Sequence, residues 1–236
     1  MLAIICATEI EYFNVKQYYE TKKVLFNVDK EYSLCRLHSG DCIVMLSDIG
    51  FENARKSIEF LLGKYDVQLV LSVGMAGGLN ESVAIGDIII SNYIHLVSDE
   101  EKSYCINESI TNFLYQMAVN AIGNQKKRGF IPKVYKGSVI SVNEFITSGR
   151  NTNCFDNTYN GWCVEMESGV IAEACRMANV SFAAIKVISD FADELALESI
   201  YKNQIKATSI LGKVLFDIIY NLRYVDYKAI AGLVNR

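Results

Sequence analysis

The chain has 236 residues, of which 51% are hydrophobic and 21% charged, a composition typical of a globular protein. Its net charge of −4 argues against a surface that binds nucleic acid or an anionic membrane, and no run of about 18 apolar residues predicts a membrane span. Seven cysteines without metal-ligand spacing, and no basic leader of a secretory signal, favour free thiols in a reducing cytoplasm.

The first half of the sequence alternates apolar runs that are typical of strands with segments of helical period. Three short strand-like runs follow one another directly, which is the pattern of a meander or hairpin. In chain order we expect a strand at 2–7, a helix over about 9–20, strands at 23–28, 32–38 and 42–48, a helix at 52–64 and a strand at 67–73.

A segment of small residues, Gly74-Met75-Ala76-Gly77-Gly78, follows the apolar run at 67–73. A buried strand that ends in small residues lets a ligand approach the backbone, because no Cβ blocks the way. In open α/β sheets the strand ends are also where ligands bind. The segment matches neither the dinucleotide fingerprint nor the P-loop. Taken alone, it favours a tight connection between two strands, with glycines required only by the backbone.

The second half continues the alternation, which predicts an α/β fold with an at least partly parallel central sheet and helices outside it. A single proline and the lack of any linker or repeat favour one domain over 1–236. Residues 223–236 either extend the last helix or cover a neighbouring subunit. In chain order we expect a strand at 85–97, a polar break at 98–103, a helix from 107 or 109 to about 122, strands at 134–142, 162–166 and 182–189, a helix at 168–178 before the last of these strands, and a final helix at 198–222.

Three acidic residues stand where a predicted strand gives way to the next segment: Glu11, Glu167 and Asp190. We expect them at the carboxyl ends of strands, in the crevice where α/β folds bind ligands. Carboxylates gathered in a pocket raise one another's pKa, which prepares one as an acid and another as a base. Each also has a structural alternative: Glu11 as a solvated helix position, Glu167 as a first-turn acidic residue, and Asp190 as the N-cap of a helix starting at Phe191.

Specific sequence elements occur in order along nearly the whole chain. Val164-Glu165-Met166-Glu167 and Ser189-Asp190-Phe191-Ala192-Asp193 are specific in combination, whereas the glycine element alone is weak. The further elements are IICATEIE at 4–11, SDIG at 47–50, GMAGGL at 74–79, GDI at 86–88 and FI at 145–146. Together they resemble the nucleoside phosphorylase family, and within it the 5′-methylthioadenosine/S-adenosylhomocysteine nucleosidase branch.

The resemblance implies a three-layer α/β/α sandwich with a central mixed sheet, a homodimer, and no metal or organic cofactor. It also implies hydrolysis of the N-glycosidic bond of an adenine nucleoside, such as methylthioadenosine or S-adenosylhomocysteine, with release of adenine and a ribose derivative. The expected partner is thus a small purine nucleoside, not a nucleic acid or a membrane.

The same resemblance implies roles for individual residues. Asp190 would be the general acid that protonates the purine at N7, Glu167 would accept hydrogen bonds from the ribose hydroxyls, and Glu11 would hold and deprotonate the attacking water. Phe145 would stack on the base and Met166 would pack on the sugar. The substrate-binding positions carried over in this way are Ile49, Met75, Ala76, Gly77, Phe145, Ile146, Glu165, Met166 and Ser189.

Water and phosphate are the two possible nucleophiles. A phosphorylase needs donors, typically arginines, to hold a dianion. Here the early segment carries Glu9 and Glu11, and the first arginine is Arg36, which favours hydrolysis. A purine nucleoside phosphorylase remains the alternative among enzymes, and a catalytically weak nucleoside-binding relative is the alternative from another class.

The chain also departs from the family pattern. Met75 and Lys186 stand where the family usually has serine and arginine, and Asp48 stands where a glycine is usual. A lysine keeps the charge of an arginine but loses its bidentate geometry toward a carboxylate. The region 94–110 is short, which leaves the preferred 5′ substituent open.

Overall fold

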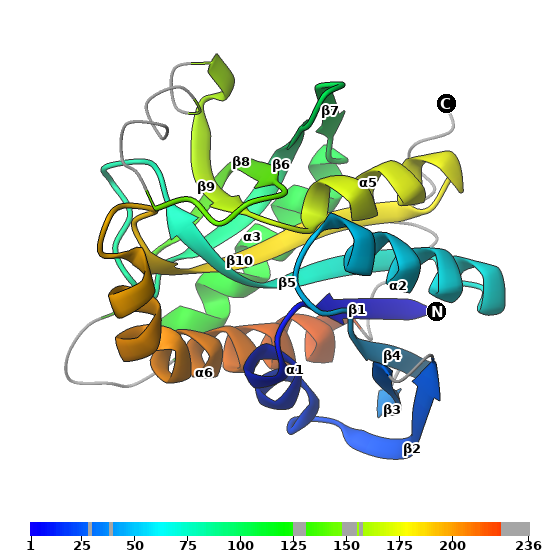
Figure 1. Cartoon of the computed structure of the whole chain (residues 1–236). Helices are drawn as coiled ribbons and strands as arrows, with labels where there is room; N and C mark the ends of the chain where they lie inside the picture. Colours follow the sequence, from blue (N-terminus) through cyan, green and yellow to red (C-terminus); the bar gives the residue numbers. More distant parts are fainter. Residues whose placement is uncertain (28–29, 38–39, 125–130, 148–154, 156–157, 223–236) are drawn as a thin grey trace.

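The computed structural model describes residues 1–27, 30–37, 40–124, 131–147, 155 and 158–222. Its strands form one mixed sheet with helices on both faces, so the predicted three-layer α/β arrangement is confirmed (Figure 1). The strand order is β10-β6-β8-β9-β5-β1-β4-β3-β2, with β7 beside β6 and a further pairing between β10 and β5. The strands are β1 (Leu2–Cys6), β2 (Glu20–Asn27), β3 (Lys30–Leu37), β4 (Gly40–Leu46), β5 (Leu69–Gly78), β6 (Ile88–Val97), β7 (Lys102–Cys105), β8 (Val134–Val142), β9 (Gly161–Glu165) and β10 (Ser181–Asp190).

Helices cover the two faces in separate groups. On one face α1 and α3 pack against α6, and on the other face α2 packs against α5 (Figure 1). The helices are α1 (Glu9–Lys16), α2 (Phe51–Lys64), α3 (Glu108–Gly123), α5 (Ser168–Met177) and α6 (Ala196–Leu222). Amphipathic periodicity explains this layering: α6 turns one stripe toward the sheet, and its buried members include Ala207, Leu211, Val214, Ile218 and Leu222.

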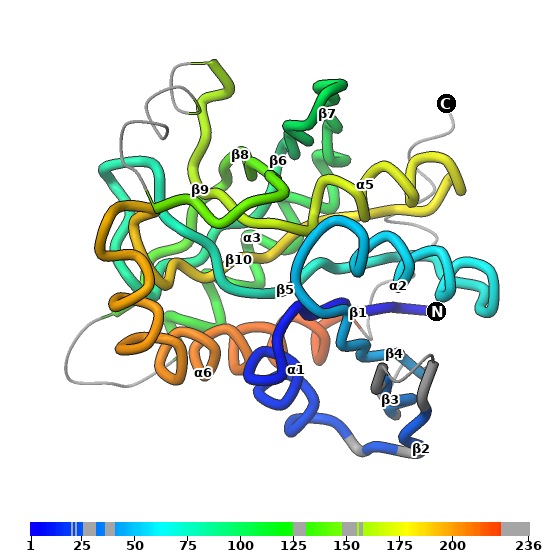
Figure 2. The backbone as a smooth tube through the Cα atoms, in the orientation of Figure 1, coloured from blue at the N-terminus to red at the C-terminus, as the bar shows by residue number. Residues whose placement is uncertain are grey.

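The central strands β1, β5 and β10 carry the site described below. All residues of β1 are buried, because a parallel strand in the middle of such a sheet is covered on both faces. β1 pairs in parallel with β5, and β5 pairs in parallel with β10. The three strands therefore end at one edge of the sheet, here called the carboxyl edge, and begin at the opposite one, the amino edge (Figure 2).

Three predicted element boundaries are wrong. The first helix ends at Lys16, and Glu20 already begins β2. β5 continues through the glycine-rich segment to Gly78, because Gly77 pairs with Asp190 on one side and with Val164 on the other. Tertiary pairing thus overrides the tendency of glycines to end a strand.

The expected polar break at 98–103 is only partly a break, because Lys102–Cys105 forms β7, antiparallel to β6. The predicted strand position of His38 and the tail at 223–236 lie outside the described residues. In the described part of the chain, no helix has both the length and the apolar character that a membrane crossing requires.

Candidate active site

A cavity of about 110 Å³ opens at the carboxyl edge, where β1, β5 and β10 end. Every residue that the sequence singled out as catalytic or substrate-binding lines it. The predicted site residues are therefore brought together from six regions of the chain. No site role follows from the sequence for seven further lining residues. Val142, Glu144 and Ile200 lie outside the sequence elements named above, whereas four others lie within them without an assigned role: Ala7, Thr8, Val164 and Ala192.

Glu11 is held by backbone N–H groups at the start of α1. Its Oε2 accepts hydrogen bonds from Thr8 N at 2.9 Å and Ala7 N at 3.1 Å, and its Oε1 accepts one from Met75 N at 2.6 Å. The Thr8 hydroxyl in turn caps the Glu11 N–H, so that the two residues form a capping box. Because its side chain is buried, Glu11 is not a solvated position on the helix. The carboxylate is fixed in one place.

Gly74 makes this position of the carboxylate possible. A Cβ at residue 74 would lie 2.7 Å from Glu11 Oε1, a separation that real Cβ atoms do not show. β5 therefore needs a glycine where the carboxylate of α1 passes over it. Burial raises the pKa of Glu11, although the N–H groups of Met75 and Thr8 and the charge of Lys186 oppose the shift.

Asp190 is the last residue of β10, and a bulge between Ile188 and Asp190 shifts the register at the strand end. Its Oδ2 accepts the Ser189 hydroxyl at 2.8 Å, and its Oδ1 accepts the Ala192 N–H at 2.9 Å. Gly77 leaves room for this turn, because a Cβ there would lie 2.9 Å from Asp190 Oδ1. Asp190 is not the N-cap of a helix at Phe191, since α6 begins only at Ala196.

The environment of Asp190 favours retention of its proton. The carboxyl group is almost fully buried, and burial raises its pKa, while the hydrogen bonds from Ala192 and Ser189 oppose the shift. The raised pKa is what a general acid needs near neutral pH. The Ser189 hydroxyl can turn to donate to the ionised form or to accept from the protonated form.

Glu167 lies where β9 gives way to α5. Instead of capping α5, its Oε1 accepts the Gly50 N–H at 2.8 Å, across from the start of α2. Gly50 has a φ of +98°, and Asp48 stands in the same connection with a φ of +64°. These left-handed conformations explain why a glycine is usual at the position of Asp48. Burial, together with the charge of Glu165, raises the pKa of Glu167 to about 8.

Glu165 was predicted to bind substrate, but its carboxylate is already occupied within the protein. Its oxygens accept the N–H of Ser168 at 3.0 Å, its Oε2 accepts the Ser168 hydroxyl at 2.9 Å, and Lys186 Nζ lies 2.9 Å from Oε2. Lys186 also donates to the Ser72 hydroxyl at 3.0 Å. Glu165 therefore anchors the first turn of α5 to β10 and β5.

Lys186 is the one buried ammonium beside these carboxylates within the described residues. Burial lowers its pKa, but Glu165, Glu167 and Glu11 outweigh burial, so that its pKa is raised and it stays charged. A small chamber of about 10 Å³, the size of one water molecule, lies between Lys186, Glu11 and Glu167. Ionisation of either glutamate is therefore coupled to one shared positive charge.

Apolar side chains form the other half of the cavity. Phe145 and Ile49 are about half exposed at its mouth, whereas Ile146 is buried. Met75 and Met166 also line the cavity. This arrangement suits a ligand with a flat apolar part and a polar part that reaches the carboxylates. No arginine occurs among the described residues that line the cavity.

The chain is similar to known proteins over most of its length. Residues 1–219 match the model of the Phosphorylase superfamily. A curated relative from Baumannia cicadellinicola, named 5′-methylthioadenosine/S-adenosylhomocysteine nucleosidase, is 31% identical over 201 residues, which cover 79% of this chain and 84% of the relative. One of the same name from Staphylococcus saprophyticus is 28% identical and covers 82% of this chain and 87% of its own.

Solved structures share the fold over most of the chain. The nucleosidase of the same name from Neisseria meningitidis, in complex with methylthio-immucillin-A, has a TM-score of 0.84 at 22% identity and covers 94% of this chain and 99% of its own. The futalosine hydrolase of Helicobacter pylori has a TM-score of 0.81 at 20% identity, with 94% and 97% covered. The match over residues 1–219, together with the 31% identical relative, shows that this chain belongs to the phosphorylase superfamily.

Proposed function

We propose that this protein hydrolyses the N-glycosidic bond of an adenine nucleoside of the 5′-methylthioadenosine or S-adenosylhomocysteine type, releasing adenine and a ribose derivative. The observation that carries the proposal is the convergence of three buried carboxyl groups, those of Glu11, Glu167 and Asp190, in one cavity. The names of the curated relatives supply the substrate class. We therefore propose a cytoplasmic enzyme whose substrate is a small purine nucleoside.

Asp190 is the general acid in this proposal. Protonation of the purine at N7 makes the base a better leaving group, and it requires a carboxylic acid that keeps its proton until the substrate is bound. Burial of Asp190 raises its pKa in that direction. Ser189 and the Ala192 N–H fix the orientation of the carboxyl group, so the proton is delivered from a defined side.

Glu167 and Glu11 act on the sugar and on the attacking water. An oxocarbenium-like ribosyl group carries positive charge, which nearby carboxylates stabilise in a site of low dielectric constant. In the proposal Glu167 accepts hydrogen bonds from the ribose hydroxyls, and Met166 packs on the sugar. Glu11 is held by three backbone N–H groups, and its role in the proposal is to orient and deprotonate the water.

Water is a better fit than phosphate as the nucleophile. A phosphate dianion next to Glu11 and Glu167 would be repelled, and among the described lining residues there is no arginine to hold it. Lys186 does not replace such an arginine, because its ammonium group is already paired with Glu165. The proposal therefore favours a nucleosidase over a phosphorylase.

The aromatic and backbone groups of the cavity hold the base. In the proposal Phe145 stacks on the purine, the backbone of Ile146 reads its edge, and Ala76 and Gly77 border it from β5. Ile49 and Met75 lie toward the sugar. Glu165, which the sequence placed among the binding residues, is better explained as the support of Glu167 and Lys186.

We further propose that the protein is a homodimer. At about 110 Å³ the cavity is smaller than the roughly 300 Å³ of a typical small-molecule site, so the 5′ substituent extends past its mouth. Next to that mouth, α6 exposes an apolar stripe at helical spacing, Leu197, Tyr201 and Ile205. A second copy packed on this stripe would cover the 5′ end of the substrate.

The dimer is tested by light scattering and by kinetics. Tyr201→Glu is expected to halve the molar mass in solution and to raise KM for nucleosides with a 5′ substituent. Met177→Glu is the matched control, because Met177 is equally apolar and exposed but lies at the far end of α5. A wild-type protein of monomeric mass contradicts the dimer without affecting the proposed reaction.

Release of free base from candidate nucleosides tests the proposed reaction. The purified protein is incubated with 5′-methylthioadenosine, S-adenosylhomocysteine, adenosine, inosine and futalosine, each with and without phosphate. Release of adenine without phosphate is expected. Release only with phosphate would identify a phosphorylase and remove the role of Glu11. No release from any of the five would contradict the proposed substrate class and point to another nucleoside or to a binding protein.

A further inference from the structure

Asp87, in the GDI element at 86–88, is a buried acidic residue to which the proposed reaction assigns no role. It lies in the connection between β5 and β6 and does not line the candidate active site. The residue is only 1% exposed, so its carboxylate needs hydrogen-bond partners inside the protein. Those partners indicate what the residue does.

Both oxygens of the Asp87 carboxylate accept backbone N–H groups. Oδ2 accepts the Ala84 N–H at 2.9 Å, and Oδ1 accepts the Lys133 N–H at 2.7 Å. The Asp87 N–H in turn donates to Ala84 O at 2.9 Å, so residues 84–87 form a turn that main chain and side chain close together. Hydrogen bonds to a carboxylate are stronger than those between neutral groups. Asp87 is therefore suited to hold this turn in one conformation and to tie it to the segment before β8.

The turn at 84–87 holds β10 at one residue, Ile188. The Gly86 N–H donates to Ile188 O at 2.8 Å, and the Ile188 N–H donates to Asp87 O at 2.9 Å. Gly86 makes its contact with a φ of +97°, a conformation that favours glycine. The two bonds continue the antiparallel pairing of β6 with β10 beyond the ladder itself. The main chain of Ile188 is thus fixed on the side of β6.

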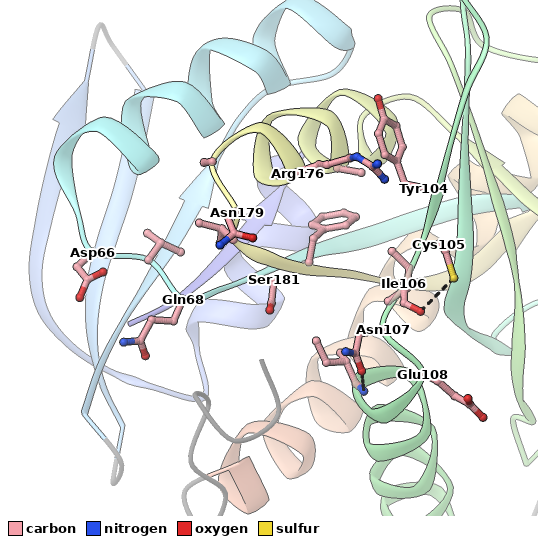
Figure 3. Close-up of a pocket in the computed structure, with 16 residues that line it drawn as sticks. Asp66, Gln68, Tyr104, Cys105, Ile106, Asn107, Glu108, Arg176, Asn179 and Ser181 are labelled. Atoms are coloured by element: carbon pink, nitrogen blue, oxygen red, sulfur yellow. Dashed lines mark hydrogen bonds between the residues drawn. The ribbon is translucent and has the colours of Figure 1, made fainter. Parts of the chain in front are cut away.

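Ile188 is also the residue after which β10 departs from regular pairing. From the amino edge, beside the cavity in Figure 3, β10 pairs in register with β5 as far as Ile188. The next pairing after Ile188 is that of Asp190, so Ser189 is the extra residue of a bulge. A bulge next to an active site re-aims a side chain. The direction in which this bulge presents the carboxyl group depends on how firmly the residue before it is held.

We propose that Asp87 is a positioning residue for the general acid: it fixes the turn at 84–87, the turn fixes Ile188, and Ile188 sets the direction in which the bulge presents Asp190. The inference rests on the proposed function, because it gives Asp87 a task in the protonation of the purine. A general acid must lie within hydrogen-bond reach of the atom that it protonates, so a displacement near 1 Å is costly. Asp87 acts through the main chain and touches neither the substrate nor the reacting atoms.

Asp87→Asn tests this role. The amide keeps one acceptor oxygen but turns an NH₂ group toward a backbone N–H, so one of the two bonds is lost. We expect kcat for base release to fall by about 10- to 100-fold, with little change in KM. Thr111→Val is the matched control, because it removes a buried hydrogen bond of 2.9 Å to Ser91 O on β6. It should lower the unfolding temperature but leave kcat unchanged.

Double variants separate the positioning of Asp190 from a general loss of structure. In an Asp190→Asn background the acid is already absent, so Asp87→Asn is expected to lower kcat no further. In a Glu11→Gln background the acid is intact, so Asp87→Asn is expected to lower kcat by its full factor. Equal effects in the two backgrounds would reflect a general distortion of the site and overturn the proposal.

A second variant covers the case in which Asp87→Asn does not fold. Gly86→Ala keeps the carboxylate but strains the turn, because residue 86 has a φ of +97°, and it is expected to lower kcat with the same dependence on background. A wild type that releases no base would contradict the proposed function itself, and this role of Asp87 with it. An active wild type whose kcat is unchanged in every variant of the turn that folds would overturn the role of Asp87 alone.

Discussion

Gly74 and Glu11 lie against each other at the centre of the site: a Cβ on residue 74 would stand 2.7 Å from Glu11 Oε1. The carboxylate cannot retreat, because three backbone N–H groups hold it from Ala7, Thr8 and Met75. The place of the proposed catalytic base is therefore determined by the absence of a side chain on β5.

Gly74→Ala is expected to displace the Glu11 carboxylate and to lower kcat by about 100-fold, the cost typical of a misplacement near 1 Å. Gly63→Ala is the matched control, because a Cβ there meets nothing within 4 Å and the residue is helical. That control should keep full activity and gain up to about 1 kcal/mol of stability. Base-release kinetics and thermal unfolding measure both effects, and unchanged kcat in Gly74→Ala would contradict the role of Glu11.

Asp190→Asn is expected to lower kcat by roughly 10²- to 10⁴-fold while leaving affinity for adenine nearly unchanged. The amide can still accept the Ala192 N–H, so the local geometry is preserved. Because burial raises the pKa of Asp190, kcat/KM of the wild type should fall as pH rises through that pKa. The variant should lack this dependence, and a variant with wild-type turnover would remove Asp190 as the acid.

Much of this site follows from the sequence, and the exceptions have physical reasons. Glu11, Glu167 and Asp190 could be predicted because each follows an apolar strand, and parallel strands end at the same edge. The structural role of Glu165 could not be predicted in this way. Its partner Lys186 lies on another strand, and the ion pair between them forms only when the chain is folded. A resemblance to known motifs carries over residue types, but not the partners that a side chain prefers.

The strand boundaries show the same limit. The glycine-rich end of β5 has low strand propensity, and its pairing with β9 and β10 is what makes it extended. Likewise β7 is a four-residue strand with two exposed charged or polar positions at its start, and it forms because β6 offers an edge. Local pattern predicts an element only where it does not depend on a distant neighbour.

Lys186→Met is expected to destabilise the protein strongly, by about 3–5 kcal/mol, because it leaves the Glu165 carboxylate buried without its partner. The double variant Lys186→Met, Glu165→Gln removes both charges and should recover most of this loss. Its activity should remain low, since the charge of Lys186 also opposes the upward pKa shifts of Glu11 and Glu167. Thermal unfolding and base release are measured for Lys186→Met, for Glu165→Gln and for the double variant. If the losses of stability in the two single variants add up to the loss in the double variant, the two side chains are not coupled and the prediction is contradicted.

Glu167 gives the free enzyme a distinct dependence of stability on pH. Its pKa is about 8 in the folded protein and near 4.5 when it is exposed, so between these values the folded state binds the additional proton. The contribution of this group is therefore greatest below pH 4.5 and is lost as pH rises toward 8. Each unit of the shift corresponds to about 1.4 kcal/mol.

Glu167→Gln removes this ionisation while keeping an acceptor for the Gly50 N–H. Its unfolding temperature should therefore rise relative to the wild type as pH increases from 5 to 8. Glu52→Gln, at an exposed position of α2, is the control and should follow the wild type over that range, because the pKa of Glu52 is lowered by its contact with Lys56 and it is ionised throughout. A constant difference between Glu167→Gln and wild type at every pH would show that Glu167 is ionised in the free enzyme, and its affinity for ribose hydroxyls would then not require loss of a proton.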